Sequence, residues 1–306
     1  MAPFPSFFAP KAFKGRAALQ APLVKYYAAG HHLESDVAEV TKARAHLVES
    51  SGVPRTAIGN FEISLLHVST ANAIPTLFWH LIFVASDSAL VSEIREELLS
   101  VTTVSPSKGG HREMKIDITK FEDSCPLFAS SYRETIRLVN GQMSTRRVMA
   151  DTTISDGQNT YLLREGADIQ IPAGVSHTDS ASWGPNVSSF DPRRFMKLDE
   201  KRILSEKEKA DEKEQRRAYF PFGGGRHLCP GRNFAFAEIL GTIAVLLLGF
   251  ELRTKDGGSI QRQPFGRPRL GTAITQPSAQ TISMGGRLTR RKGWEDAVFK
   301  FVTGKE

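Results

Sequence analysis

The sequence predicts a mainly α-helical protein with small β-sheets. Residues from about 10 to 50 repeat apolar side chains at helical spacing, and the segment from Ile58 to Val84 is apolar on all sides. A further apolar run extends from Ile239 to Phe250, whereas the β-type runs between residues 145 and 171 are short. With 306 residues, the chain is long enough to bury a sizeable core in one large domain.

The composition is that of an ordinary globular protein. The chain is 40% hydrophobic and 24% charged, and its net charge of +7 permits an acidic partner or an anionic membrane surface. Basic residues are not interleaved with aromatic ones in a recognition-helix pattern, so no nucleic acid is expected as a partner. Two cysteines exclude a disulfide framework and indicate a reducing compartment.

No membrane anchor is expected in this chain. The longest apolar run, Ile239 to Phe250, is shorter than the roughly 18 to 20 residues of a membrane span. The first eight residues contain no basic region followed by an apolar core, so no signal peptide is expected.

The first fifty residues are predicted to be helical and carry no chemical motif. Two apolar stripes indicate the buried faces of the helices: Leu19, Leu23, Tyr26 and Tyr27 in the first, and Val37, Val40, Ala43 and Leu47 in the second. His31 and His32 lie in a glycine-flanked turn. Because neighbouring residues do not share a helix face, they are expected to be exposed surface rather than metal ligands.

The segment from Ile58 to Val84 is expected to form one long buried helix. Pro75 lies inside it and removes a backbone hydrogen bond, which predicts a kink. Two interpretations of the kink stay open: a purely structural bend, or a break that makes room for a ligand.

Shorter elements follow. An amphipathic helix is expected after Ser86 or Asp87, then a loop over 101–118, then a helix from Cys125-Pro126 to Leu138.

Residues 197–217 alternate acidic and basic side chains and predict a solvated loop or an exposed helix. The remainder contains strand-like pieces and a basic cluster, Arg287, Arg290, Arg291 and Lys292, interpreted as solubilising surface or a docking site for an acidic protein partner.

The candidate site is the stretch 219–232, Tyr-Phe-Pro-Phe-Gly-Gly-Gly-Arg-His-Leu-Cys-Pro-Gly-Arg. Its glycines allow close backbone approach to a bulky group, and Cys229 stands where a helix is expected to begin, with Pro230 as the first helical residue. The helix N-terminus together with Arg226 and His227 favours the thiolate, which is the form that binds metal.

Two other interpretations of this stretch have little support. A phosphate-binding loop would require the Lys-Ser/Thr spacing that is missing after the glycines. A zinc site would require further cysteines at ligand spacing, but Cys125 is the only other cysteine and no C-x-x-C pair exists.

The order Phe222-Gly223-x-Gly225-x-His227-x-Cys229-Pro230-Gly231, continued by Ala235 and Glu238, resembles the cysteine loop of the cytochrome P450 family. The resemblance implies the cytochrome P450 fold and Cys229 as the axial ligand of the iron of haem b. It also implies a set of haem-binding residues: Phe222, Gly223, Arg226, His227, Gly231 and Ala235. The family usually has arginine where His227 stands, so the propionate contact stays open between Arg226 and His227.

Two upstream elements support the resemblance. Glu134-Thr-Ile-Arg137 and Phe190-Asp-Pro-Arg-Arg194-Phe195 are similar to the family's E-x-x-R and P-x-R-F elements, which implies a structural network of Glu134, Arg137 and Arg194 that fixes the cysteine loop. By the same resemblance, Arg146 would contact a haem propionate. His177 is similar to the histidine of the family's His-Arg-Asp turn, and a structural role is expected for it rather than metal ligation.

The central helix matches the family in part. Ala71, Asn72 and Thr76 are implied as catalytic residues of the distal lining, while Ile74 replaces the usual acid and Pro75 the usual threonine. The pattern resembles the subgroup of sterol 7-alpha- and 12-alpha-hydroxylases and prostacyclin synthase. This departure from the family keeps open a chemistry on peroxide substrates.

The resemblance therefore implies a haem-thiolate monooxygenase that inserts one oxygen atom from O2 into a lipophilic sterol, terpenoid or other secondary metabolite. Electrons would come from NADPH through NADPH-cytochrome P450 reductase, at the cytosolic face of the endoplasmic reticulum membrane. The alternatives are a haem-thiolate peroxide isomerase and a truncated, non-catalytic fragment. Residues 1–306 are expected to form a single domain that is incomplete at the N-terminus, with 55–285 as the best-matching core.

Overall fold

The computed structural model describes residues 7–106, 110–196, 205–265, 272–283 and 285–304. Helices predominate. In chain order they are α1 (Pro10–Ala28), η1 (His31–Leu33), α2 (Glu39–Ser50), α3 (Arg55–Thr70), α4 (Ala73–Ala85), α5 (Ser88–Ser100), η2 (Ile118–Lys120), α6 (Phe121–Ser124), α7 (Pro126–Val139), α8 (Ala173–His177), α9 (Ser180–Trp183), α10 (Glu206–Ala218), η3 (Gly225–His227), α11 (Arg232–Gly249) and α12 (Ala279–Ser283).

The strands are short, as predicted, and within the described residues they form four small sheets. They are β1 (Thr102–Pro106), β2 (Arg112–Asp117), β3 (Met143–Arg147), β4 (Thr152–Ser155), β5 (Thr160–Leu163), β6 (Asp168–Pro172), β7 (Phe250–Thr254), β8 (Gly286–Arg290) and β9 (Ala297–Val302). The pairings are β1–β2, β3–β6, β4–β5 and β7–β8, all antiparallel, and β2–β9, which is parallel. Mainly helical structure with small sheets is therefore confirmed.

The chain divides into two compact units, Met1–Ala71 and Asn72–Glu306. In the first unit, α1 and α3 pack closely at Gly59, where an added Cβ would lie 2.4 Å from the backbone nitrogen of Val24. The small core contains Tyr27, Ala45 and Ile58. The expectation of a single domain stays a prediction.

Two predictions about the first unit are wrong. Val40 and Leu47 are 61% and 66% exposed, and it is Ala45 that faces the core. His31 is exposed and pairs with Glu34, but His32 is only 1% exposed, and its ring is tilted against that of Tyr27 with centroids 5.0 Å apart. The apolar stripe of α2 was ambiguous because an alanine on the true inner face carries little hydrophobic signal.

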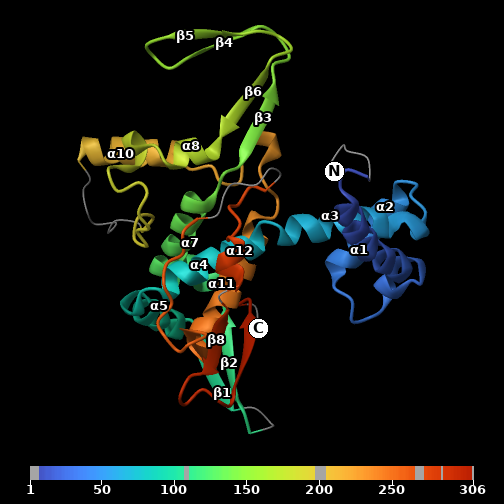
Figure 1. Cartoon of the computed structure of the whole chain (residues 1–306), viewed down its shortest axis with the longest axis vertical. Coiled ribbons are helices and arrows are strands. Elements are labelled where there is room, and N and C mark those ends of the chain that lie inside the picture. Colours follow the sequence, from blue (N-terminus) through green and yellow to red (C-terminus); the bar gives the residue numbers. More distant parts are fainter. Residues whose placement is uncertain (1–6, 107–109, 197–204, 266–271, 284, 305–306) are drawn as a thin grey trace. The chain divides into compact units, whose positions relative to one another are not determined.

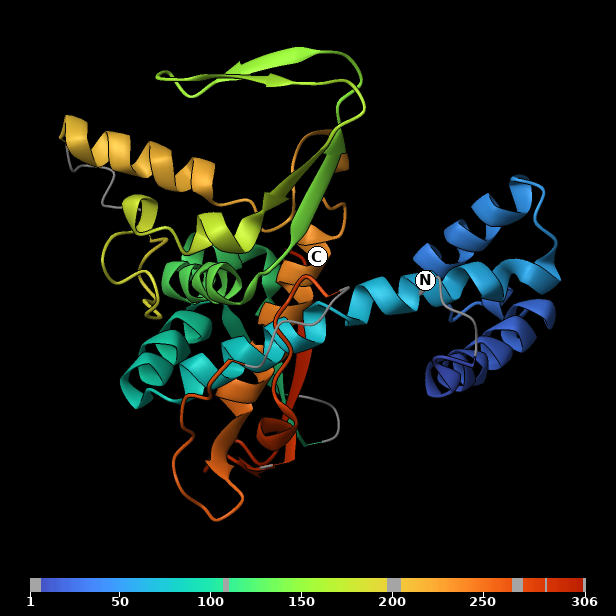
Figure 2. The same ribbon diagram turned by 45° about the horizontal axis from the view of Figure 1, so that its top comes forward.

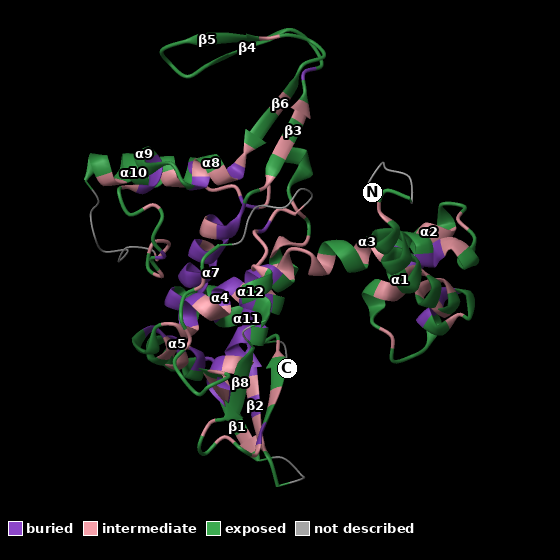
Figure 3. Ribbon diagram, in the orientation of Figure 1, coloured by how far each residue is buried: buried purple, intermediate pink, exposed green. Residues whose placement is uncertain are grey.

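The second unit is built around α4, α5, α7 and α11, which lie together in its middle (Figure 1). Figure 3 shows buried residues concentrated in α4, α7 and α11. Trp79 and Phe83 of α4, Phe128 of α7 and Leu240 of α11 are at most 4% exposed and belong to one hydrophobic core. The β3–β6 ribbon leads away from this core and continues into the β4–β5 hairpin (Figure 2).

The long central helix is broken rather than continuous. The first part, α3, ends at Thr70 and the second, α4, begins at Ala73, so Pro75 lies in the first turn of α4. Pro75 has no N–H to donate to the carbonyl of Ala71, which explains the break. The prediction of burial is right for α4 but wrong for α3, where Phe61 and Val68 are 50% and 62% exposed.

The predicted loop over 101–118 is also wrong, because it contains β1 and β2. The parallel partner of β2 is β9, about 185 residues further along the chain, with Arg112 opposite Ala297. Pairing at this sequence separation leaves no local signal in a segment rich in Ser, Thr, Lys and Gly.

Side chains from other elements cap the start of α7 and the end of α11. The Glu97 carboxylate accepts bonds from the backbone nitrogens of Leu127 and Phe128 at the start of α7, each at 2.9 Å. At the end of α11, Arg95 donates to the carbonyl of Leu247 at 2.8 Å, and Arg291 donates to that of Leu248 at 2.7 Å. Arg291 of the basic cluster therefore has a structural role, since orphan carbonyls at a helix C-terminus need donors.

The charge run forms an exposed helix over its described part. Ser205 caps α10 through a reciprocal capping box with Glu208. Residues 197–204 of the run lie outside the described residues.

Two stretches, Arg55–Ala85 and Arg232–Gly249, are long and apolar enough by length and composition to cross a membrane. This corrects the expectation that no segment reaches that length. The stretches include α4 and α11, and core helices of globular proteins satisfy the same two criteria.

Candidate functional site

The loop that carries Cys229 is closed on itself by backbone bonds. The N–H of Cys229 donates to the carbonyl of Phe222 at 3.0 Å, and the N–H of Leu228 donates to that of Gly225 at 3.2 Å. Gly223 and Gly225 have φ angles of +74° and +61°, a region that other residues rarely adopt. The glycines therefore shape the loop, in addition to reducing its bulk.

The loop leads directly into α11. Gly231 is the N-cap residue, and an added Cβ there would lie 3.9 Å from the Cys229 sulfur. Pro230 precedes the helix by two residues, so its predicted place as the first helical residue is wrong. Arg232, the actual first residue, donates to the carbonyl of Cys229 at 3.1 Å. Cys229 is half-buried with a free thiol.

Two side chains from the end of α7 and from β3 hold the loop. Asn140 donates to the carbonyl of Pro221 at 2.9 Å, and Arg146 donates to that of Gly224 at 3.3 Å. The Arg146 guanidinium thus lies against the glycines of the loop, whereas the side chains of Arg226 and His227 are exposed. Sequence reasoning missed Asn140; its position directly after a predicted helix was the available signal.

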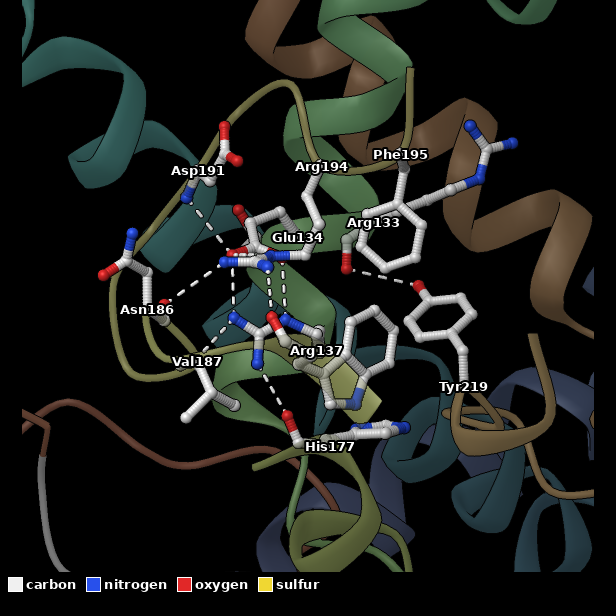
Figure 4. A network of polar contacts seen from close by, with 12 residues as sticks. Arg133, Glu134, Arg137, His177, Asn186, Val187, Asp191, Arg194, Phe195 and Tyr219 are labelled. Atoms are coloured by element: carbon white, nitrogen blue, oxygen red, sulfur yellow. Dashed lines mark hydrogen bonds and ion pairs between the residues drawn. The ribbon is translucent and has the colours of Figure 1, made fainter. Parts of the chain in front are cut away.

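A buried ion cluster joins α7 to the segment that contains Arg194 (Figure 4). The Glu134 carboxylate accepts two bonds from Arg137, each at 2.8 Å, and its oxygens lie 3.1 Å from the Arg194 Nε. Glu134 and Arg137 are 0% exposed. The structure therefore brings the three predicted residues together in a charge-assisted arrangement that fixes the side chains in one geometry.

The cluster also fastens the segment that leads to the loop. Arg137 donates to the carbonyls of His177 at 2.6 Å and Val187 at 2.8 Å, and Arg194 donates to that of Trp183 at 3.0 Å (Figure 4). The Arg137 guanidinium lies 5.1 Å from the centre of the Trp183 ring. Backbone between residues 177 and 194 is thus tied to α7 by two arginines.

His177 is fully buried at the end of α8. Its Nε2 lies 3.3 Å from the backbone nitrogen of Phe220, the second residue of the loop stretch. Burial, and secondarily the charge of Arg137, lowers its pKa to about 4. The described residues contain no group of three or more His, Cys, Asp or Glu side chains suited to a metal ion.

The predicted distal residues flank the break between α3 and α4. Ala71 closes α3 in the first unit, whereas Asn72 and Thr76 belong to the second. The Thr76 hydroxyl donates to the carbonyl of Asn72 at 2.7 Å. The Asn72 side-chain oxygen is buried and has no hydrogen-bond partner among the described residues, and Ile74 is 62% exposed.

A pocket of about 560 Å³ adjoins the other side of the loop. It is lined in part by Tyr132, Phe222, Arg232 and Phe236. Tyr132 packs edge-on against Phe236 at 5.4 Å, and burial raises its pKa. Its hydroxyl has no partner among the described residues. No sequence signal distinguishes Tyr132 from an ordinary core residue of α7.

Comparisons with known proteins agree with this geometry. A sequence model described as "Cytochrome P450" matches residues 55–281. A cytochrome P450 monooxygenase of Gibberella zeae is 36% identical over 295 residues, which cover 95% of this chain and 54% of that protein. Cytochrome P450 monooxygenase nodJ of Hypoxylon pulicicidum is 28% identical over 298 residues, covering 97% and 55%.

More distant similarity supports the subgroup resemblance. Cholesterol 7-alpha-monooxygenase of Cricetulus griseus is 26% identical over 216 residues, covering 70% of this chain and 42% of that protein. The chain spans about half the length of the curated relatives it matches.

The fold agrees with a solved structure. The crystal structure of a cytochrome P450, CYP102L1, superposes with a TM-score of 0.55 over 78% of this chain and 47% of that chain, at 23% sequence identity. The family match covers most of the chain and includes the cysteine loop and the ion cluster. The chain belongs to the cytochrome P450 family.

Proposed function

We propose that this chain carries the haem-thiolate centre of a monooxygenase that inserts one oxygen atom from O2 into a lipophilic small molecule. The observation that carries the proposal is the half-buried Cys229 thiol on a glycine-shaped loop that is tied to a buried ion cluster. When bound, haem would supply the oxygen chemistry, which an axial thiolate favours by donating electron density.

The residues present fit haem b. Cys229 offers a single sulfur donor, and Gly231 presents no side chain to it, whereas a Cβ added at Gly231 would lie 3.9 Å from the sulfur. Arg146 places a guanidinium beside Gly224, which suits an anionic propionate. Leu228, 40% exposed, adds an apolar side chain next to the sulfur-bearing residue. Together these groups match an apolar, planar macrocycle that carries iron and carboxylates.

The proposed roles follow from these contacts. Cys229 would be the metal ligand and Arg146 a propionate partner. The remaining predicted cofactor-binding residues would line the loop: Phe222, Gly223, Arg226, His227, Gly231 and Ala235. Glu134, Arg137 and Arg194 would hold the segment before the loop in place, because their bonds reach residues 177–187.

On the distal side, Asn72 and Thr76 are proposed to line the substrate space, with Ala71 preceding them in the chain. The unpartnered oxygen of Asn72 is available to accept a bond from a bound hydroxyl or amide. Because the Thr76 hydroxyl already donates to a backbone carbonyl, a proton transfer through it would require that bond to break.

A second candidate function is a peroxide isomerase at the same centre. Ile74 and Pro75 stand where the family resemblance places an acid and a threonine, and neither side chain can move a proton. A hydroperoxide or endoperoxide substrate would need neither O2 nor a reductase.

For the monooxygenase, the proposed partners are NADPH-cytochrome P450 reductase and a sterol, terpenoid or other secondary metabolite. The proposed location is the cytosolic face of the endoplasmic reticulum membrane.

The test is the absorption spectrum of the purified full chain, reduced and treated with carbon monoxide. We expect a thiolate-type Soret band in the wild type and in the control Cys125→Ser, because Cys125 is fully buried in the core and its thiol contacts the carbonyl of Glu97. The band should be lost in Cys229→Ser. Absence of haem incorporation in the wild type would overturn the proposal for this chain.

Turnover then separates the two candidate functions. Product formed only with NADPH, reductase and O2 supports the monooxygenase. Rearrangement of a lipid hydroperoxide in the absence of reductase and NADPH supports the isomerase instead.

A further inference from the structure

We propose that His177 is a positioning residue for the cysteine loop, holding the Phe220 amide with its uncharged ring and linking it to the buried ion cluster. The proposal rests on the proposed haem-thiolate function for its purpose, since it concerns the residues that fix the path of the loop. It assigns a role to a side chain that the cysteine-loop motif does not include.

The contacts of His177 join two structures. Its backbone carbonyl accepts a bond from Arg137 at 2.6 Å (Figure 4). Its ring nitrogen Nε2 lies 3.3 Å from the Phe220 nitrogen. The ring stacks on Tyr219 with centroids 5.5 Å apart and tilts against Phe220 at 5.7 Å. One residue therefore connects the Glu134 cluster, through Arg137, with the start of the loop.

Phe220 is an effective place to hold the loop. The next two residues are anchored as well, since the carbonyl of Pro221 accepts a bond from Asn140 and that of Phe222 accepts the N–H of Cys229. The bond to His177 is therefore the first of three consecutive attachments on the chain entering the loop.

The bond also defines the charge of the ring. Phe220 contributes an N–H donor, so Nε2 must be an unprotonated acceptor and the single ring proton must be on Nδ1. Nδ1 is buried and has no hydrogen-bond partner among the described residues. A second proton would remove the acceptor and create a buried cation without a carboxylate partner.

The charged surroundings oppose that second proton. From α7, the guanidinium of Arg137 acts on the ring, and from the loop entrance the adjacent group is Tyr219, a phenol whose pKa burial raises. The other elements packed against α8 are α10 and β3. The charged side chains of α10 are exposed except that of Glu208, which is half-buried in the capping box with Ser205. On β3, Arg147 is exposed and Arg146 is directed to Gly224.

The sign of the pH effect follows from this. The native pKa of His177 is lowered to about 4, whereas an unfolded or opened histidine titrates near 6.5. The attachment is therefore complete above pH about 6.5 and weakens as the pH falls from there to about 4.

The test is amide hydrogen exchange at Phe220 in the full chain without added haem, corrected for the intrinsic exchange rate at each pH. Two variants separate the effect of the hydrogen-bond acceptor from the effect of ring protonation. His177→Gln keeps a side-chain oxygen acceptor that does not titrate, and His177→Leu has no acceptor. His80→Gln is the matched control, because His80 is also fully buried and bonds to Ser131 instead.

We expect protection of the Phe220 amide to fall about two- to tenfold in His177→Leu and to be retained in His177→Gln and His80→Gln. Between pH 7.5 and 5.5, wild-type protection should fall about tenfold, while that of His177→Gln should stay constant. Equal protection in the Leu and Gln variants, or parallel pH profiles in wild type and His177→Gln, would overturn the proposal.

If His177→Leu does not fold, the comparison of the wild-type and His177→Gln pH profiles still tests the proposed role of His177. Failure of the chain to bind haem would remove the proposed function but leave this measurement valid, because no haem is added. The two proposals can therefore fail separately.

Discussion

Glu134 lies fully buried between the guanidiniums of Arg137 and Arg194. Glu134→Gln preserves its shape but leaves the Arg137 cation without a counter-charge at 0% exposure. We expect a loss of about 3–5 kcal/mol in the free energy of unfolding, the usual cost of breaking a buried pair by removing one partner. Urea denaturation of the full chain measures it.

The matched control for Glu134→Gln is Glu212→Gln, which breaks an exposed pair with Arg216 on α10. Exposed pairs of this kind contribute little, so the urea midpoint should not change measurably. Similar losses of stability in Glu134→Gln and Glu212→Gln would contradict the claim that burial makes the Glu134 pair important.

His80 of α4 should make stability depend on pH. Its Nε2 lies 2.8 Å from the Ser131 hydroxyl, which itself donates to the carbonyl of Phe128, so Nε2 carries the proton and Nδ1 is a buried acceptor without a partner among the described residues. Burial lowers the pKa of His80 to about 3. Its contribution to stability is therefore complete above pH about 6.5 and is lost as the pH falls toward 3.

The measurement is the free energy of unfolding between pH 7.5 and 5. We expect His80→Gln to remove up to about 1.4 kcal/mol per pH unit from the wild-type slope. His31→Gln is the control, since His31 is exposed and pairs with Glu34 at the surface. An unchanged slope in His80→Gln would show that the native ring is protonated as easily as the unfolded one.

At the scale of elements, the packing of α1 on α3 depends on Gly59. Alanine is the better helix former by about 1 kcal/mol, yet an added Cβ at position 59 would lie 2.4 Å from the Val24 nitrogen and 2.5 Å from the Leu23 carbonyl carbon. Both atoms are backbone and cannot rotate away. We therefore expect Gly59→Ala to lower the melting temperature of the chain despite its higher propensity.

Gly15→Ala tests the same substitution without the clash. Gly15 lies inside α1 with nothing within 4 Å of an added Cβ, so the change should raise stability by about 0.5–1 kcal/mol. We therefore predict that Gly59→Ala lowers stability and Gly15→Ala raises it, and calorimetry of both variants checks this. Two stabilising substitutions would mean that α1 and α3 do not pack as closely as described.

Local sequence signals were enough to predict helices such as α5 and α7. The prediction failed for strands whose pairing partner lies far away in the sequence. The helices α5 and α7 begin where Asp87 and Pro126 predict, because caps act within one turn. The strands β1 and β2 were missed because the pairing of β2 with β9 involves the far end of the chain.

At the scale of the molecule, β9 connects that end to the core. Gly249 of α11 leaves room for the ring of Phe299, which would be 2.8 Å from an added Cβ, and Phe299 stacks on Trp294 at 6.1 Å. We expect Phe299→Ala to cost about 3 kcal/mol in the free energy of unfolding, near the lower end for a core phenylalanine because it is only partly buried.

Val298→Ala, one residue earlier on the opposite face of β9, is the control. Val298 is 45% exposed, so little change is expected. Urea denaturation together with amide exchange in β2 would show whether the loss spreads through the sheet. An equal loss of stability in Phe299→Ala and Val298→Ala would contradict the assignment of Phe299 to the inner face of β9 and Val298 to the outer face.

The sequence by itself predicted which residues form the candidate site. The spacing of Phe222, Gly223, Gly225, Cys229 and Gly231 is a local pattern, and a loop of this kind is built from contacts within a few residues. The E-x-x-R spacing likewise places Glu134 and Arg137 on one helix face, because residues three apart are neighbours there.

Only the tertiary structure decided how that loop is held. The bonds from Asn140, Arg146 and His177 to the loop join residues 43 to 81 positions apart in the sequence. The burial of His32 and His80 also depends on packing. Such contacts depend on which surfaces meet in three dimensions, and no periodicity or motif along the chain encodes that.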